Sequence, residues 1–210
     1  MVFLSNTDDH EKPADPYKAA NLDECVSIKD KVRDLSKFVD SCKFGIMTTR
    51  DSSSGALFSR CMVVAAKEVD GVDLIFFTNT ETGKVNHIKS DPHVNVSFLD
   101  SSGQWASFAG ETSIITESGI VAKYYSSMLK AWIGDLGDGK HDGSPNDPRL
   151  GIIKVRSRTI TYAITSNNAI TRGFKVAQGA VTGNSPAIHK LREISEKEIL
   201  TWRSSKEMVE

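Results

Sequence analysis

The chain has 210 residues, 39% of them hydrophobic, and its 26 basic and 27 acidic side chains leave a formal net charge of −1 at pH 7. This length and apolar content suit one domain with a real core, and the balanced charge excludes the positive field that gathers nucleic acid. The 3 cysteines form no Cys-x-x-Cys pair, so we expect reduced thiols, a cytoplasmic location and no metal. No apolar run reaches the roughly 20 residues of a membrane span, and we expect no membrane partner.

The first 20 residues are polar and contain Pro13 and Pro16, which predicts a flexible N-terminal arm. From Ile28 onward, apolar side chains recur at the i, i+4, i+7 and i+11 spacing of an amphipathic helix that reaches Cys42. Such a stripe is typical of a helix that packs on a sheet.

Runs rich in β-branched and aromatic residues follow this helix and predict β-strands. These runs lie at 44–49, 56–66, 73–79, 93–100 and 104–116. The connections "DSSSG" and "VDG" are too short for a crossover helix, so the strands they join should pair antiparallel.

The second half of the chain predicts further helices and more sheet. Apolar residues at helical spacing indicate a helix over 118–133, and a Gly-rich acidic loop over 133–149 is expected to form a flexible lid or rim. The stretch 150–164 predicts a strand pair or one long bent strand, and a helix-like piece follows it.

Together these elements predict an α+β fold, mainly antiparallel β, in which a six-stranded barrel is flanked by helices. Closing the sheet removes exposed strand edges. The interior of a small barrel is filled by side chains, so a large ligand must sit outside it, between loops or subunits. A dimer interface is therefore the expected place for a cofactor.

The first chemical signal is the sequence Thr82-Gly83-Lys84 after the predicted third strand. A nucleotide-triphosphatase phosphate loop would need a glycine five positions before Gly83 and a serine or threonine after Lys84, where this chain has Thr78 and Val85. A glycine-containing turn that opens a helix still offers backbone N–H groups and a positive dipole end, to which Lys84 adds a charge. A phosphate monoester would suit it, and a solvated lysine is the alternative.

Arg60 is the second signal, because it stands within the apolar strand sequence "LFSRCMVVAA". A charge in such a strand needs a partner unless it faces solvent. Two cations from neighbouring strands could converge on one phosphate, with Arg60 supplying bidentate geometry.

Several of these motifs, in this order, resemble the flavin-binding split barrel of the pyridoxamine 5'-phosphate oxidases. They are "RCMV" at 60–63, "FFTN" at 76–79, "TGK" at 82–84, "HIKSDPHVNVSF" at 87–98 and "WASFAGE" at 105–111. The later "AW" at 131–132, the "NDP" at 146–148 and "RLGIIKV" are similar to the general stress protein branch and its fungal blue-light-inducible relatives. The resemblance covers about residues 25–165.

This resemblance implies that FMN is the cofactor. Arg60 would grip the phosphate or ribityl chain. Cys61, Met62 and Val63 are implied to line the isoalloxazine ring. Phe77, Thr78 and Asn79 are implied to form the strand end that faces the flavin. Thr82, Gly83 and Lys84 are implied to bind the phosphate. Trp105 and Ser107 would reach the flavin from the other subunit, and Trp132 would cover the ring.

We therefore expect an N-terminal arm over 1–20, an FMN-binding split-barrel domain over 21–182 and a polar helical tail over 183–210. The expected function is that of an FMN-dependent oxidoreductase linked to stress response. It would act as a homodimer with the flavin at the interface, on NAD(P)H or a small-molecule substrate.

Two alternatives remain open beside this function. One is a non-catalytic flavin binder that serves storage or regulation, and the other is a haem-binding or deazaflavin-binding relative. The tail lacks the Trp, Arg and His signature with which the oxidase grips its vitamin substrate, so oxidation of pyridoxamine phosphate is not expected. The sequence names no catalytic acid or base.

Overall fold

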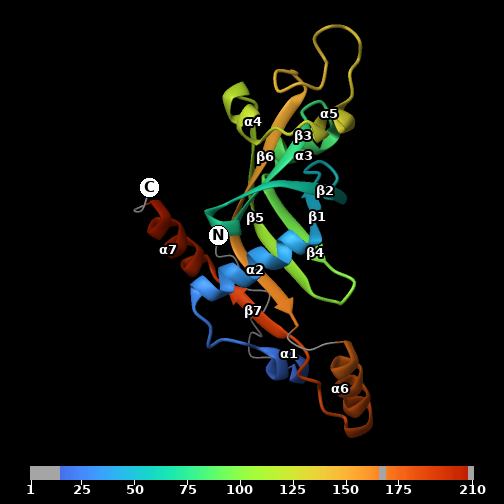
Figure 1. The fold of residues 1–210 in the computed structure, drawn as a ribbon, viewed down its shortest axis with the longest axis vertical. Helices are drawn as coiled ribbons and strands as arrows, with labels where there is room; N and C mark the ends of the chain where they lie inside the picture. The colour runs from blue at the N-terminus through green and yellow to red at the C-terminus, as the bar shows by residue number, and fades with distance from the viewer. Residues whose placement is uncertain (1–14, 166–168, 208–210) are drawn as a thin grey trace. The chain divides into compact units, whose positions relative to one another are not determined.

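The computed structural model describes residues 15–165 and 169–207. Within these ranges the fold is α+β, and Figure 1 labels its elements. The strands are β1 (Phe44–Arg50), β2 (Leu57–Glu68), β3 (Asp73–Asn79), β4 (His93–Leu99), β5 (Trp105–Ile115), β6 (Leu150–Ile164) and β7 (Lys190–Ile194). The α-helices are α1 (Pro16–Asn21), α2 (Ile28–Cys42), α3 (Gly83–Ser90), α4 (Ser118–Tyr124), α5 (Met128–Ile133), α6 (Ala169–Thr182) and α7 (Glu196–Glu207).

The strands form one sheet in the order β3-β2-β1-β4-β5-β6-β7, and an additional pairing of β3 with β6 closes six of them into a barrel. The pairs β1–β2, β2–β3, β3–β6 and β6–β7 are antiparallel. This confirms the predicted fold class and both predicted hairpins. Residues 150–164, for which two alternatives were open, form a single long strand.

The chain divides into two compact units, which we call unit 1 and unit 2. Unit 1 contains residues up to Cys42, Ser97–Phe108 and the chain from Arg158 onward. Unit 2 contains Lys43–Val96 and Ala109–Ser157. Strands β4, β5 and β6 each contribute residues to both units.

Unit 2 is built on β1, β2 and β3, with α3 packed on β1. The first six residues of β3 are buried except Phe77, which is half-buried, because this strand pairs with both β2 and β6 and is covered on both faces. The side chains of Ile75, Val121, Leu150 and Ile152 form an apolar cluster in this unit. The cluster joins β3, β6 and α4.

The segment predicted as one helix over 118–133 forms two short helices, α4 and α5. The chain leaves helical geometry at Tyr125, where ψ is 139°. Ser126 and Ser127 follow, and serine side chains compete with the helical backbone for hydrogen bonds, which favours a break at this point. The single-helix prediction is wrong for this reason.

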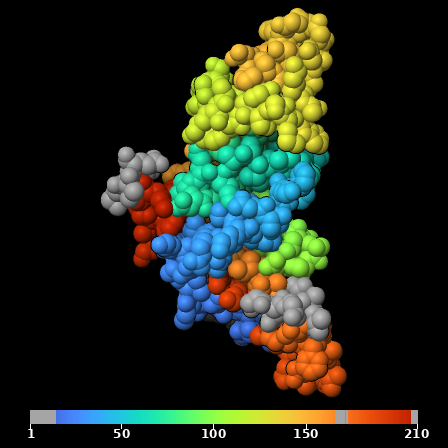
Figure 2. All heavy atoms as spheres, viewed as in Figure 1, coloured from blue at the N-terminus to red at the C-terminus, as the bar shows by residue number. Residues whose placement is uncertain are grey.

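The loop after α5 is tied down at its base. The buried carboxylate of Asp147 accepts hydrogen bonds from the backbone N–H of Gly143, at 2.7 Å, and from the Arg149 side chain, at 2.7 and 3.1 Å. Arg149 Nη2 also donates to the carbonyl of Gly134 at 2.7 Å, and the Tyr125 hydroxyl donates to that of Gly143. In Figure 2 the segment from α4 through this loop forms a continuous yellow-green to yellow surface. The base of the predicted flexible lid is thus held by buried polar bonds.

Unit 1 carries α2, whose residues Val32, Leu35, Phe38 and Val39 are buried. The helix spans Ile28–Cys42 as predicted and packs against β7. Part of the predicted arm is also structured, because Pro16–Asn21 forms α1. The side chain of Asn21 bonds the backbone of 186, 188 and 189. Residues 1–14 of that arm lie outside the described residues.

The predicted polar tail contains a strand as well as a helix. Strand β7 pairs with β6, and α7 follows it. Ile194 and Ile199 are fully buried, so this segment is part of the core of unit 1. The domain boundaries expected from the sequence remain a prediction.

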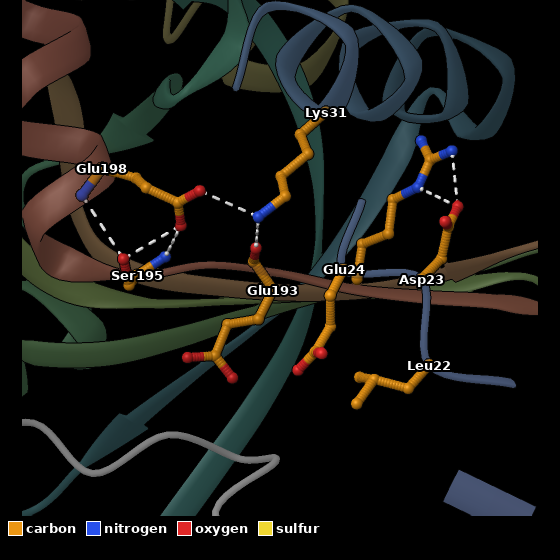
Figure 3. A pocket seen from close by; sticks show the side chains of 8 residues that line it. Leu22, Asp23, Glu24, Lys31, Glu193, Ser195 and Glu198 are labelled. Carbon is orange, nitrogen blue, oxygen red and sulfur yellow. Dashed lines mark hydrogen bonds and ion pairs between the residues drawn. The ribbon is translucent and has the colours of Figure 1, made fainter. Parts of the chain in front are cut away.

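Buried charges join these elements of unit 1. Arg192 bonds Asp23 at 2.9 Å and Asp34 at 2.8 Å, and Lys31 bonds Glu198 at 2.8 Å and the carbonyl of Glu193 at 2.8 Å. Figure 3 shows several of these bonds around a polar cavity of about 250 Å³. Both cations are paired with carboxylates, so we assign this network to the stability of unit 1.

None of the helices in the described ranges is both long enough and apolar enough to span a membrane.

Candidate functional site

The candidate site is built on the β1–β2 hairpin of unit 2. Arg60 pairs with Met47 in the antiparallel register, and directly opposed residues point to the same face of a sheet. Met47 is fully buried, and Arg60 is partly buried. Cys61 and Val63 stand at alternate positions and are exposed, which is the alternation expected of a strand with one covered face. Of the run predicted to contact flavin, only Arg60 and Met62 share the more covered face.

The guanidinium of Arg60 is held by neighbours from three directions. Its Nη1 donates to Thr49 Oγ1 at 2.8 Å and to the carbonyl of Phe58 at 3.4 Å. Its Nη2 lies 3.3 Å from Nδ1 of His87, which belongs to α3. None of these three partners is a carboxylate.

Lys84 enters the site from the first turn of α3. At the end of β3, the Asn79 side chain accepts a hydrogen bond from the backbone N–H of Glu81 at 2.8 Å and shapes the turn. The Thr82 hydroxyl donates to the carbonyl of Asn79 at 2.8 Å and accepts from Lys84 Nζ at 2.9 Å. The Thr82 hydroxyl of this turn therefore holds the Lys84 ammonium in place.

The N-terminus of α3 is open. Thr82 precedes the helix, and its side chain caps none of the first N–H groups. A Cβ atom placed on Gly83 would meet no heavy atom within 4 Å. Packing therefore does not require a glycine there, and its absent side chain leaves the N–H groups accessible to a ligand.

The electrostatics of this site are unusual because its two cations have no counter-charge among the residues that the structure describes. Burial lowers the pKa of Lys84, and the positive charge of Arg60 lowers it further. Burial alone lowers the pKa of Arg60. Within residues 15–165 and 169–207, neither side chain has a carboxylate partner. An anion with two or more oxygens would relieve both desolvated charges.

The remaining predicted residues are placed as follows. Phe77 packs against the apolar cluster of unit 2, and Thr78 is buried and donates to the carbonyl of Asn79. Trp132 lies on α5 with 76% of its surface exposed. Trp105 and Ser107 lie on β5 in unit 1, so their predicted part in the site remains a prediction.

Two residues of the cluster were not predicted. His87 stands three positions after Lys84 in α3, and residues at i and i+3 share a helix face. This spacing could have identified it. Thr49 lies at an inward position of β1, opposite Phe58, but a threonine in a strand gives no sequence signal of its own.

In the part of the chain that the structure describes, no three His, Cys, Asp or Glu side chains are grouped so that they could hold a metal ion.

Comparison with known proteins places this geometry in a family. A model of the family described as "Pyridoxamine 5'-phosphate oxidase like" matches residues 30–187. The chain belongs to the pyridoxamine 5'-phosphate oxidase-like family. It is 55% identical over 203 residues to Protein bli-3 of Neurospora crassa, and the match covers 96% of this chain and 97% of that protein. Both the family and the fungal branch expected from the sequence are confirmed.

Solved structures of the pyridoxamine 5'-phosphate oxidase-like family share the fold. A protein related to general stress protein 26 from Clostridium acetobutylicum aligns with a TM-score of 0.58 at 15% identity, covering 83% of this chain and 99% of that one. A pyridoxamine 5'-phosphate oxidase-related, FMN binding protein from Nostoc punctiforme aligns with a TM-score of 0.50 at 12% identity, covering 69% and 85%. At these low sequence identities, the structural alignments establish a common barrel architecture and nothing finer.

Proposed function

We propose that this protein binds FMN and that Arg60 and Lys84 hold its phosphate. The observation that carries the proposal is the pair of desolvated cations that lack a carboxylate partner among the described residues. Membership in the family, together with the FMN binding relative from Nostoc punctiforme, supports flavin as the ligand that brings the phosphate.

The residues of the site fit a phosphate monoester. Arg60 offers a planar, always-charged donor set, Lys84 offers a point charge, and the N-terminus of α3 offers a positive dipole end. When bound, FMN would supply the electron-transfer chemistry, and the protein would supply its binding and orientation. The resemblance implies that Cys61, Met62 and Val63 of β2 line the flavin ring.

A homodimer with flavin at the interface is part of this proposal. On β1 and β2, the residues Phe44, Ile46 and Val63 have 51%, 44% and 49% of their surface exposed. Phe44 pairs with Val63, and Ile46 pairs with the exposed Cys61, so these side chains share one face of the hairpin. A compact apolar face on paired strands is suited to a self-complementary two-fold contact.

Charge substitution tests the dimer. We expect Ile46→Lys to shift the protein from dimer to monomer in light scattering, because it buries a lysine in the apolar contact. Lys67→Glu, at the other end of β2, is the control. A wild-type monomer that still binds FMN tightly would contradict the interface site.

We further propose that the flavin form is an oxidoreductase, with a role in stress response as in the relatives named for it. A visible spectrum of the purified protein, followed by titration with FMN, tests the cofactor. A flavin band and a melting temperature that rises with FMN are expected. A haem or deazaflavin spectrum would replace FMN as the ligand.

Turnover separates the enzyme from a flavin store. We expect NADPH or NADH to bleach the flavin band and oxygen or a quinone to restore it. A flavin form that neither nucleotide reduces, and that passes no electrons to either acceptor, would leave a binding protein for storage or regulation.

A further inference from the structure

Arg60, Thr49 and His87 form a closed triangle of polar contacts from three elements of unit 2. Arg60 Nη1 lies 2.8 Å from Thr49 Oγ1, and Arg60 Nη2 lies 3.3 Å from His87 Nδ1. Thr49 Oγ1 and His87 Nδ1 are themselves 3.3 Å apart. Two acceptors at this separation fit the end of the guanidinium that carries Nη1 and Nη2.

The triangle specifies the state of the imidazole. Arg60 can only donate, so His87 Nδ1 must accept, and the ring proton belongs on Nε2. The Thr49 oxygen accepts from Arg60, and its hydroxyl hydrogen shares the single lone pair of His87 Nδ1 with Arg60 Nη2. The ring of Phe58 lies against the imidazole in a tilted arrangement, with 5.1 Å between centroids and 34° between planes, and this contact limits the rotation of the imidazole.

This arrangement selects which donors of Arg60 are left. The guanidinium has five N–H donors in fixed directions. Thr49 and the Phe58 carbonyl take the two on Nη1, and His87 takes one on Nη2. The two that have no partner within the described residues are the Nε hydrogen and the second Nη2 hydrogen, and these lie side by side on one edge of the plane. Such an edge matches two oxygens of a phosphate.

We propose that His87 is a positioning residue that, with Thr49, turns the Nε and Nη2 edge of Arg60 toward the anion. This inference rests on the proposed phosphate site and adds a residue that acts through Arg60. A side chain at position 87 that cannot accept a hydrogen bond leaves the Arg60 guanidinium free to rotate. Phosphate binding must then restrict that rotation, and the loss of conformational entropy weakens the binding.

Two substitutions separate the acceptor from the ring. His87→Phe keeps an aromatic ring against Phe58 but has no acceptor, whereas His87→Asn places an oxygen near the position of Nδ1 and has no ring. We expect FMN affinity to fall about tenfold in His87→Phe, the loss typical of one hydrogen bond to a charged group, and to stay within about threefold of wild type in His87→Asn. Affinities are measured by titration, and melting temperatures show whether each variant is folded.

A double-mutant cycle asks whether His87 works through Arg60. In the Arg60→Ala background, His87→Phe should cause no further loss of affinity, because the group that it positions is gone. Thr49→Val, which keeps the volume of the buried side chain and removes its acceptor, provides an independent arm. We expect the same direction of change there.

The outcomes are distinguishable from failure of the proposed function. If the wild type binds FMN and Arg60→Ala weakens binding, while His87→Phe and Thr49→Val bind like wild type, the positioning role is wrong and the phosphate site stands. Additive losses in the double mutant would also overturn it. If neither the wild type nor any variant binds FMN or inorganic phosphate, the phosphate site itself is absent and the positioning role falls with it.

Discussion

The two units treat their partly buried cations in opposite ways. In unit 1, Arg192 is paired with two carboxylates, and Lys31 is paired with Glu198. In unit 2, Arg60 and Lys84 have no carboxylate partner among the described residues, and burial lowers the pKa of both. Desolvating a cation is costly wherever it occurs. In unit 1, carboxylates offset this cost. In unit 2, the cost for Arg60 and Lys84 is not offset by any described carboxylate, so an anionic ligand could supply the negative charge.

The contrast is not a property of unit 2 as a whole. Arg149 belongs to the same unit as Arg60, and its guanidinium forms an ion pair with the carboxylate of Asp147. The polar cavity of unit 1 (Figure 3) differs from the candidate site, because the two cations that line it, Lys31 and Arg192, are paired with carboxylates. The missing counter-charge, rather than the presence of a cavity, therefore marks the candidate site.

The largest effect is expected where a paired cation is removed. Arg192→Leu leaves Asp23 and Asp34 without their common partner in unit 1. We expect it to lower the free energy of unfolding by about 3 kcal/mol, as is typical when one member of a buried pair is deleted. Urea unfolding measures the loss. Arg33→Leu is the control, because Arg33 is exposed and its ion pairs are worth less than about 1 kcal/mol.

Removing an unpaired cation should weaken binding rather than folding. We expect Arg60→Ala and Lys84→Ala each to weaken FMN binding by roughly 1 to 3 kcal/mol, the range for a charge-assisted hydrogen bond. Arg50→Ala, on the exposed side of β1, should bind FMN like wild type. Unchanged affinity in both site variants would contradict the phosphate anchor.

The paired carboxylate in unit 2 predicts a pH effect. The Arg149 side chain holds the pKa of Asp147 well below its ordinary value. Because the folded-state pKa is lowered, the charged form contributes stability that is present above about pH 4 and is lost as the pH falls further. Asp147→Asn should therefore lower the melting temperature by a few degrees at pH 7 and flatten its dependence below pH 4. Thermal scans across this range would refute the assignment if the two curves ran parallel.

The smallest effect has the opposite sign. When folding lowers the pKa of a lysine, the charged form of that lysine destabilises the folded state. Lys84 is charged at pH 7, so this cost applies there. We therefore expect Lys84→Met to raise the melting temperature of FMN-free protein by about one or two degrees while it weakens FMN binding. Lys89→Met, at an exposed position of the same helix, should leave both unchanged. A fall in stability on losing Lys84 would mean that its charge is already compensated.

Much of the fold could be predicted from the sequence because the signals were local. The apolar stripe that begins at Ile28 marked α2, and short glycine-bearing connections fixed the first hairpins. Strand β7 was missed because Lys190, Arg192 and Glu193 make its sequence read as polar. Its arginine is buried only because carboxylates distant in sequence meet it.

The candidate site divides in the same way. Arg60 and Lys84 could be identified because a cation in an apolar strand and a lysine after a glycine turn are visible in sequence. The i, i+3 spacing from Lys84 could have added His87, but its contact with Arg60, and the part of Thr49, depend on β1, β2 and α3 meeting in space. The alternation of β2 also moved Cys61 and Val63 to the exposed face, away from Arg60.

The most direct test of the uncompensated-cation account compares FMN with riboflavin, which has the same ring and ribityl chain but no phosphate. We expect the wild type to bind FMN at least about tenfold more tightly than riboflavin in fluorescence titrations, and Arg60→Ala to lose most of that preference. Equal affinity of the wild type for the two flavins would show that these cations do not hold the phosphate.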